Sequence, residues 1–283
     1  MTRIGQQGFG ARTIQRAYNG LDTGDGNGTP VLSEFYFMFT GAGVDHHLNT
    51  IALYPDGPIQ DTAPNADPNW NPTNPDNGNL RLTYQDKEGN DEYFYNIGHE
   101  LVSGVTRFRM RDVGCRGGCT RPINRPDADS AFAIVGFQFS YFSTTDHHVD
   151  EIAIQEREGV LEVAYNDKND DDTFSYVVDY VWLNGQRLLS SGSRNGTARG
   201  GARSPLPSGG TRLVGGFRLN FTSQDHHIRD VGVRLVGSDI EVYYGDKNFD
   251  DQFSWTVDYV TLRPRIVIGD FIDLRDGQLV ARA

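Results

Sequence analysis

Lysine is almost absent from this sequence. The 283 residues include 23 arginines but only three lysines, Lys87, Lys168 and Lys247, and each lysine follows an aspartate. An acid-rich, lysine-poor composition is common in proteins from GC-rich or salt-adapted sources, so the bias itself excludes no function. The retained lysines indicate that a compact ammonium suits the same position three times. The net charge of −12 argues against a general nucleic-acid surface.

Cysteine is scarce, and long apolar runs are missing. Cys115 and Cys119 are too few for a disulfide scaffold or for a zinc site made of cysteine alone. We expect a small loop staple or two free thiols, with zinc shared with outside histidines as the alternative. No segment approaches the ~18–20 apolar residues of a membrane span. The first residues lack the apolar core of a Sec signal. We therefore expect a cytoplasmic protein, export without a cleaved Sec signal, release by lysis with a particle, or a mature sequence given a new Met.

Established catalytic motifs are missing as well. Residues 21–24 spell the aspartic-protease word LDTG, but they lie in a glycine-rich turn and have no second copy. His99 and Glu100 begin like a zincin motif, yet Ser103 stands where the second histidine is required. The chain has no phosphate loop, dinucleotide fingerprint or nucleophile elbow. We therefore expect no enzyme.

One tripeptide, Asp-His-His, occurs three times and takes six of the seven histidines. The copies begin at Asp45, Asp146 and Asp225, and an Asp-Lys word follows each of them. The two words are 21 residues apart in the second and third copies and 41 residues apart in the first. The excess is a Pro/Asn-rich segment, residues 55–79, which we expect to be an inserted surface loop.

Alternating apolar residues around these words predict an all-β fold. In the third copy Phe217, Leu219 and Phe221 alternate before the Asp-His-His word, and three similar runs follow it. We interpret each copy as a four-stranded antiparallel meander. One meander buries its apolar face poorly, so the three tandem units should pack on one another in a sandwich-like arrangement or in a prism-like or trefoil-like one.

The predicted organisation has seven parts. They are an N-terminal arm (1–30), repeat 1 (31–105), an Arg/Cys connector (106–130), repeat 2 (131–185), a Gly/Ser/Arg connector (186–211), repeat 3 (212–264) and a C-terminal strand or tail (265–283). Gly/Arg-rich connectors of this kind are usually flexible and solvated. As a hypothesis, they instead dock on acidic loops of neighbouring modules or subunits.

Each Asp-Lys word is taken here as the six-residue segment that begins at its aspartate, residues 86–91, 167–172 and 246–251. Oxygen-bearing side chains recur at positions one, three, five and six of this segment. The one-three-five spacing resembles the first half of an EF-hand loop and predicts Ca²⁺ ligands. The candidates are Asp86, Glu88, Asn90, Asp167, Asn169, Asp171, Asp246, Asn248 and Asp250. A true EF-hand is excluded, because position six is aspartate and no glutamate follows at position twelve. The alternative is a plain acidic turn whose side chains cap their own backbone.

Two hypotheses address the Asp-His-His words. Neighbouring residues on a strand point to opposite faces, so one histidine of each pair should face the packed side. As a folding signature, the histidines would stack on aromatic rings, and an inner one would hydrogen-bond Asp172 or Asp251. As a transition-metal site, histidines of different copies would meet at a pseudo-threefold axis, or one would join the aspartate. The residues concerned are Asp45, His46, His47, Asp146, His147, His148, Asp225, His226 and His227.

The functional expectation follows from the triplication. An active site usually exists once per chain, whereas copied polar words suit a folding signature or multivalent binding. We expect a non-catalytic structural or adhesive protein that self-associates into a homo-oligomer or larger assembly, such as a fibre, a surface layer or a virion, and is extracellular or virion-associated. The alternative is a carbohydrate-binding module or lectin with Ca²⁺-assisted loops, in which Trp70 of the inserted loop stacks on a sugar. The third hypothesis is a metal-dependent enzyme built on copy one, where His99 replaces a tyrosine of the other copies.

Overall fold

The computed structural model is all-β, as expected. It describes residues 3–11, 14–17, 28–40, 46–55, 60–61, 79–87, 91–143, 146–168, 172–222, 226–248, 251–263, 272–275 and 278–281. These residues contain no α-helix and one 3-10 turn, Gly185–Arg187. The ladders are antiparallel, apart from a short parallel pairing of β5 (Gln60–Asp61) with β8 (Arg107–Arg116).

Three sets of four strands share one pairing pattern. The first set is β3 (Thr29–Phe39), β4 (Leu48–Pro55), β6 (Asn79–Asp86) and β7 (Glu92–Val102). The second is β10 (Ala131–Tyr141), β11 (Val149–Arg157), β12 (Val160–Asp167) and β13 (Thr173–Leu183). The third is β15 (Thr211–Phe221), β16 (Ile228–Val236), β17 (Asp239–Asp246) and β18 (Gln252–Leu262). In every set the first strand pairs with the fourth and the second with the third.

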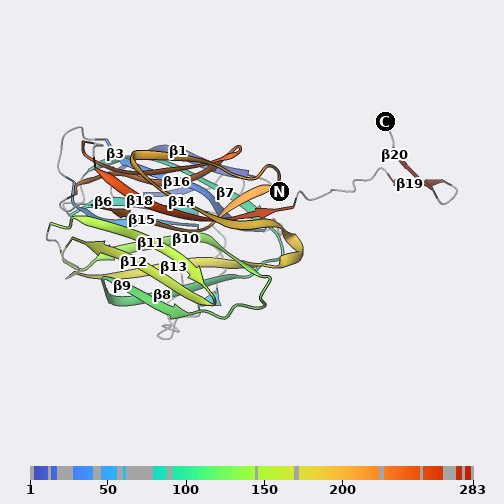
Figure 1. Ribbon diagram of the computed structural model, residues 1–283, viewed down its shortest axis with the longest axis horizontal. Helices are drawn as coiled ribbons and strands as arrows, with labels where there is room; N and C mark the ends of the chain where they lie inside the picture. Colours follow the sequence, from blue (N-terminus) through green and yellow to red (C-terminus); the bar gives the residue numbers. More distant parts are fainter. Residues whose placement is uncertain are drawn as a thin grey trace.

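The sets are joined to one another by further ladders. The second strand of each set pairs with the first strand of the next one: β4 with β10, β11 with β15, and β16 with β3. The three sets therefore close into a ring, and strands far apart in sequence lie side by side (Figure 1). The expected meander is wrong, because the first strand of each set pairs with the fourth strand and not with the second. Alternation gives each strand a buried face but does not determine which strand lies beside it.

The arm and both connectors form strands that precede a set and lie along its fourth and third strands. β1 (Arg3–Ala11) pairs with β7 and β2 (Ile14–Ala17) with β6. β8 pairs with β13 and β9 (Gly118–Pro122) with β12. The long β14 (Leu188–Pro205) pairs first with β18 and then with β17. The connectors are thus part of the sheet, and not flexible segments resting on acidic loops.

The glycines of β14 are explained by the aromatic rings beside them. A Cβ atom on Gly192 would lie 2.9 Å from the hydroxyl of Tyr259, and one on Gly196 would lie 3.1 Å from the Trp255 ring. Both rings belong to β18, which pairs with this half of β14. Glycine here makes room for aromatic rings, so a composition typical of a linker builds a packed strand.

The hydrophobic core is continuous across the sets. Phe35, Phe137 and Phe217 stand at the same place in β3, β10 and β15 and are fully buried. Their ring centres form a triangle with sides of 5.2, 5.1 and 5.7 Å. Burial of each such side chain stabilises the fold by about 1.5–3 kcal/mol. This phenylalanine triangle ties the three sets together at the centre of the ring.

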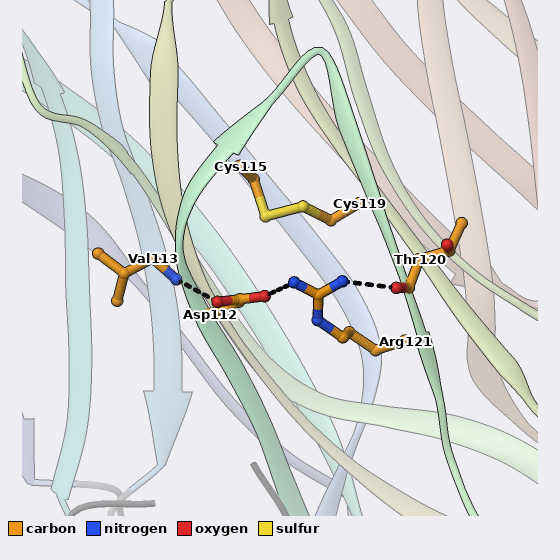
Figure 2. Close-up of a disulfide and its surroundings, with 6 residues drawn as sticks. All are labelled: Asp112, Val113, Cys115, Cys119, Thr120 and Arg121. Atoms are coloured by element: carbon orange, nitrogen blue, oxygen red, sulfur yellow. Dashed lines mark hydrogen bonds and ion pairs between the residues drawn. A yellow bond between two sulfur atoms is a disulfide. The ribbon is translucent and has the colours of Figure 1, made fainter. Parts of the chain in front are cut away.

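The two cysteines form a disulfide across the tight turn between β8 and β9 (Figure 2). The loop staple is confirmed, and the zinc alternative for these residues is wrong because the sulfurs are bonded to each other. Beside the disulfide, Arg121 forms an ion pair with Asp112 and donates a hydrogen bond to the carbonyl oxygen of Thr120 at 2.9 Å. These contacts fix the hairpin at the edge of the second set.

The C-terminal residues form a separate two-stranded sheet of β19 (Ile272–Arg275) and β20 (Gln278–Ala281). Among the residues described by the structure, no helix has the length and apolar character needed to cross a membrane.

Candidate functional site

The second histidines of the three Asp-His-His words meet at one point. His47, His148 and His227, called the axial histidines below, have ring centres 4.9 Å apart on all three sides of a triangle. Their ring planes are tilted by 70° to 88° to one another. One ligand-type atom from each ring lies within 4.8 Å of the other two. Residues 180 positions apart in the sequence thus form a threefold cluster, as one of the two sequence hypotheses requires.

The first histidine of each word is buried and locked in place. These inner histidines, His46, His147 and His226, stack on an aromatic ring at 3.9 to 4.1 Å between ring centres, against Phe39, Tyr141 and Phe221 respectively. The Nδ1 atom of each contacts the last aspartate of its own Asp-Lys word: Asp91 at 3.3 Å, Asp172 at 2.8 Å and Asp251 at 2.5 Å. The ring stacking and the aspartate contact that the folding-signature hypothesis predicts are therefore present at all three inner histidines.

The backbone beside each axial histidine has the same irregularity in all three sets. The ladder between the second and third strands shifts register directly after it, at residues 48–50, 149–151 and 228–230. In the first two sets the lysine amide of the Asp-Lys word donates to the axial histidine carbonyl, from Lys87 to His47 at 3.1 Å and from Lys168 to His148 at 3.0 Å. A β-bulge re-aims a side chain, and here it turns the axial histidine toward the ring centre.

Three buried tyrosines tie each word to the neighbouring set. Tyr84, Tyr165 and Tyr244 donate to backbone carbonyls one or two residues after an axial histidine, at Arg229, Leu48 and Val149 respectively. All three rings are fully buried, and burial raises the pKa of each hydroxyl well above its usual value. Each tyrosine stays neutral and acts as a hydrogen-bond donor between sets.

A charged pair explains one of the retained lysines. The Lys87 ammonium forms an ion pair with Asp146, the aspartate of the Asp-His-His word in the second copy. This hydrogen bond lowers the pKa of Asp146 below its usual value. Asp146 also lies 3.9 Å from Nε2 of His47. Burial, with His148 and Lys87 nearby, lowers the pKa of His47, so this imidazole is neutral at neutral pH.

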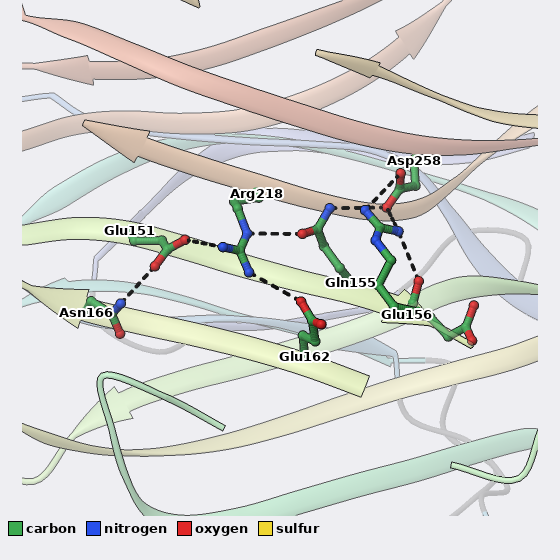
Figure 3. A network of polar contacts seen from close by, with 8 residues as sticks. Glu151, Gln155, Glu156, Glu162, Asn166, Arg218 and Asp258 are labelled. Atoms are coloured by element: carbon green, nitrogen blue, oxygen red, sulfur yellow. Dashed lines mark hydrogen bonds and ion pairs between the residues drawn. The ribbon is translucent and has the colours of Figure 1, made fainter. Parts of the chain in front are cut away.

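The junctions between sets differ in chemistry although their ladders are equivalent. Between β15 and β11, Arg218 contacts Glu151 at 3.1 Å and Gln155 at 3.0 Å (Figure 3). Between β3 and β16, the Tyr36 hydroxyl donates to Asp230 at 3.0 Å. Between β10 and β4, the hydroxyls of Thr50 and Ser140 are 2.8 Å apart. The histidine and tyrosine contacts thus recur at all three junctions, whereas the polar side-chain contacts around them differ from one junction to the next.

The predicted calcium ligands are only partly within the described residues. Asp86, Asp167 and Asp246 are buried, and Asn248 is exposed. Asp86 lies with Asp91 and His46, and Asp167 with Asp172 and His147, in clusters whose ligand-type atoms are within 4.8 Å. The first aspartate of the word therefore meets the sixth residue, and burial with the neighbouring Asp86 raises the pKa of Asp91. Calcium binding by these words stays a prediction.

Several predicted site residues lie outside the described residues. They are Asp45, Asp225, Glu88, Asn90, Asn169, Asp171, Asp250 and Trp70. The roles proposed for them, including the glycan contact of Trp70, stay predictions.

His99, which the metal-enzyme hypothesis singled out, is a core residue. Its side chain is fully buried, its Nε2 lies 2.9 Å from the Val135 carbonyl oxygen, and burial lowers its pKa to about 4. It belongs to none of the candidate metal clusters found among the described residues.

A cleft of about 840 Å³ between the second and third sets has charged walls, but Arg157 there is paired with Asp258 at 2.8 Å.

Comparisons with known proteins give no family. No protein-family model matches the sequence, and no curated protein matches it. The atomic structure of Sulfolobus Turreted Icosahedral Virus is 10% identical over 90% of this chain and 83% of that one, with a TM-score of 0.19. The major capsid protein P2 from Bacteriophage PM2 is 8% identical over 92% and 99% of the two chains, also with a TM-score of 0.19. Likeness this weak carries no argument about fold or function.

The sequence hypotheses missed two sets of residues at the ring centre. The tyrosines stand two residues before the aspartate of each Asp-Lys word, and the phenylalanines share one position in the first strand of each copy. Aligning the three copies residue by residue would have found both. That alignment could not have shown that the residues of different copies touch.

Proposed function

We propose that the chain is a non-catalytic structural protein in which three β repeats form one pseudo-threefold body, and that it serves as a subunit of a larger assembly. The observation that carries this proposal is the use made of the copied residues. The inner histidines lock each repeat, the tyrosines tie it to the next, and the axial histidines meet between all three. The repeated residues make contacts within and between the copies, which favours a scaffold. An enzyme would instead need one site whose residues differ from those of the other copies.

Internal symmetry also suits a position within a symmetric assembly. A body with three similar faces can make three similar contacts, as a homotrimer does, and closed symmetric association is the usual outcome of repeated contacts. The exposed large apolar side chains support this proposal. Phe9 on β1 and Val113 on β8 are 65% and 71% exposed, and each lies opposite the third residue of the fourth strand of its set, Phe94 and Ser175 respectively. Apolar groups in equivalent places would provide equivalent contacts.

The test is the mass of the untagged protein in solution, measured by size-exclusion chromatography with light scattering and by electron microscopy. The net charge of −12 opposes association, so the series should extend to high salt, which screens like charges. We expect multimers or particles that weaken in Phe9→Ser and Val113→Ser. Phe142→Ser is the matched control, because Phe142 is 56% exposed but lies on neither β1 nor β8. A chain that stays monomeric at every concentration and binds glycans on an array would favour the lectin alternative.

A further inference from the structure

The axial histidines differ chemically from the phenylalanine triangle at the centre of the ring. At the centre of the ring the chain fills the contact between the sets with three phenylalanines, which need no polar partner. At the end of the ring it places three imidazoles in a slightly smaller triangle, with sides of 4.9 Å. Three imidazoles at this spacing offer nitrogen ligands to a single ion, which phenyl rings cannot do. We propose that His47, His148 and His227 together bind one divalent transition-metal ion, with zinc as the probe.

The spacing of the rings fits this role. With metal–nitrogen distances of about 2.0–2.1 Å and tetrahedral angles, the ring centres of three ligating histidines stand about 5 Å apart. The observed triangle has sides of 4.9 Å. The ligand-type nitrogens lie within 4.8 Å of one another, and they would be about 3.4 Å apart around one ion. On binding, the rings would rotate about their side-chain bonds to close this difference.

The ligand type selects the ion. Three imidazole nitrogens suit zinc, copper, nickel or iron, whereas calcium and magnesium take oxygen ligands. The site is therefore separate from the predicted calcium ligands of the Asp-Lys words. In addition, Nδ1 of His47 is buried and makes no hydrogen bond within the described part of the chain. A nitrogen in that state gains an interaction when a metal ion binds.

The surroundings hold the three rings before any ion arrives. The inner histidine next to each ligand is stacked and bonded to an aspartate, and the β-bulge after it sets the direction of the axial side chain. Asp146 places a carboxylate 3.9 Å from His47, where it can serve as an outer partner of the ligand or take the fourth position. Supporting contacts of this kind raise metal affinity by fixing ligand geometry.

The bound ion would join the three sets at the axial histidines. Because the site exists only in the folded chain, binding stabilises the fold by mass action. The ion would thus hold the three sets together at the end of the ring, as the phenylalanine triangle does at its centre.

The experiment uses the full chain, purified without an affinity-tag metal and stripped of bound ions. Zinc uptake is measured by isothermal titration and elemental analysis, and cobalt(II) absorption reports the ligand geometry of the wild type. We expect one zinc ion per chain, the intense visible bands of tetrahedral cobalt and a higher melting temperature. His148→Asn should lower the zinc affinity by more than the about 10–100-fold cost of losing an outer partner. The triple histidine-to-asparagine variant should bind none at the axis.

Asp86→Asn is the matched control. Asp86 belongs to the cluster with His46 and Asp91, so zinc bound there would be weakened by this change, whereas axial binding would not. The proposal is overturned if the wild type takes up no stoichiometric zinc or cobalt at micromolar concentration. It is also overturned if the triple variant, shown to be folded by circular dichroism, binds zinc as the wild type does. Should the variants fail to fold, the cobalt spectrum of the wild type decides, because an axial site gives tetrahedral nitrogen coordination and surface ions give octahedral bands.

Discussion

The hydroxyl of Tyr165 donates a hydrogen bond to the carbonyl oxygen of Leu48, 3.1 Å away and 117 residues earlier in the chain. Leu48 directly follows the axial histidine His47, so the bond joins the second set to the first at the point where the histidines meet. Tyr244 makes the same contact from the third set to Val149 of the second, at 3.2 Å. The junctions of the ring thus depend on a hydrogen bond that recurs in equivalent places.

Tyr165→Phe should lower the free energy of unfolding by about 1–2 kcal/mol, because it leaves a buried carbonyl without its donor. Tyr176→Phe is the control, since the Tyr176 hydroxyl is buried but has no hydrogen-bond partner in the described residues. Urea unfolding measures both variants. Equal losses in the two variants would mean that the bond to Leu48 contributes nothing specific.

The contact between each inner histidine and its aspartate should contribute to stability. Asp172→Ala removes the partner of His147, whose ring is fully buried, and we expect a loss of about 1.5–3 kcal/mol, typical of a hydrogen bond to a charged group. Asp239→Asn, which breaks only the exposed pair with Arg203, should change stability little. The comparison is made by chemical denaturation at neutral pH. If Asp172→Ala were as stable as Asp239→Asn, the lock assigned to His147 would not exist.

A buried ion pair should make Asp179 the most sensitive carboxylate of the second set. Burial disfavours its charge, but Arg107 and Arg109 outweigh burial and lower its pKa. Its stabilising contribution is therefore present above the pKa of the unfolded chain and is lost as the pH falls through the lower folded pKa. Asp179→Asn at neutral pH should cost about 3–5 kcal/mol, since two buried guanidinium groups lose their partner.

Asp258→Asn is the matched control for that change. Asp258 occupies the same place in β18 as Asp179 does in β13, but its partner Arg157 is 45% exposed. The control should therefore lose much less stability than Asp179→Asn. Similar thermal and urea midpoints for the two variants would contradict the account of the buried pair.

Two buried groups should oppose each other in the pH dependence of stability. Burial raises the pKa of Asp230 to about 6, so its contribution favours the folded state at low pH and declines as the pH rises toward 6. Burial lowers the pKa of His99 to about 4, so its contribution is lost as the pH falls from about 6.5 to 4. Asp230→Asn removes the first effect. Between pH 4 and 6 its stability should rise more steeply with pH than that of the wild type, and parallel curves would contradict this.

Much of the local structure could be predicted from the sequence. The period-two runs gave the strands, and the spacing of the two repeated words placed the inner histidine beside the end of the Asp-Lys word, as His147 and Asp172 show. Both features arise within one set, where the inner histidine and its aspartate are 25 positions apart in the second and third sets and 45 in the first. Alternation and turn chemistry are sufficient at that range.

The arrangement of the sets could not be predicted in the same way. A strand such as β10 pairs with β13 of its own set and with β4 of another. Both neighbours place apolar side chains beside Phe137 and Phe139 of β10. The sequence of β10 does not distinguish them. The glycines of β14 were equally ambiguous, because Gly196 is explained only by the Trp255 ring that lies against it. The meeting of the axial histidines follows from these non-local choices.

The measurement that tests the account most directly is the set of nuclear Overhauser contacts between the imidazole ring protons of His47, His148 and His227, in protein labelled at histidine. With ring centres 4.9 Å apart on every side, all three pairs should give contacts, assigned by replacing one axial histidine at a time. Contacts for all three pairs would show that the repeats meet at one point. Axial rings that give no contacts with one another, in a chain whose inner histidines do contact Phe39, Tyr141 and Phe221, would contradict the closed ring.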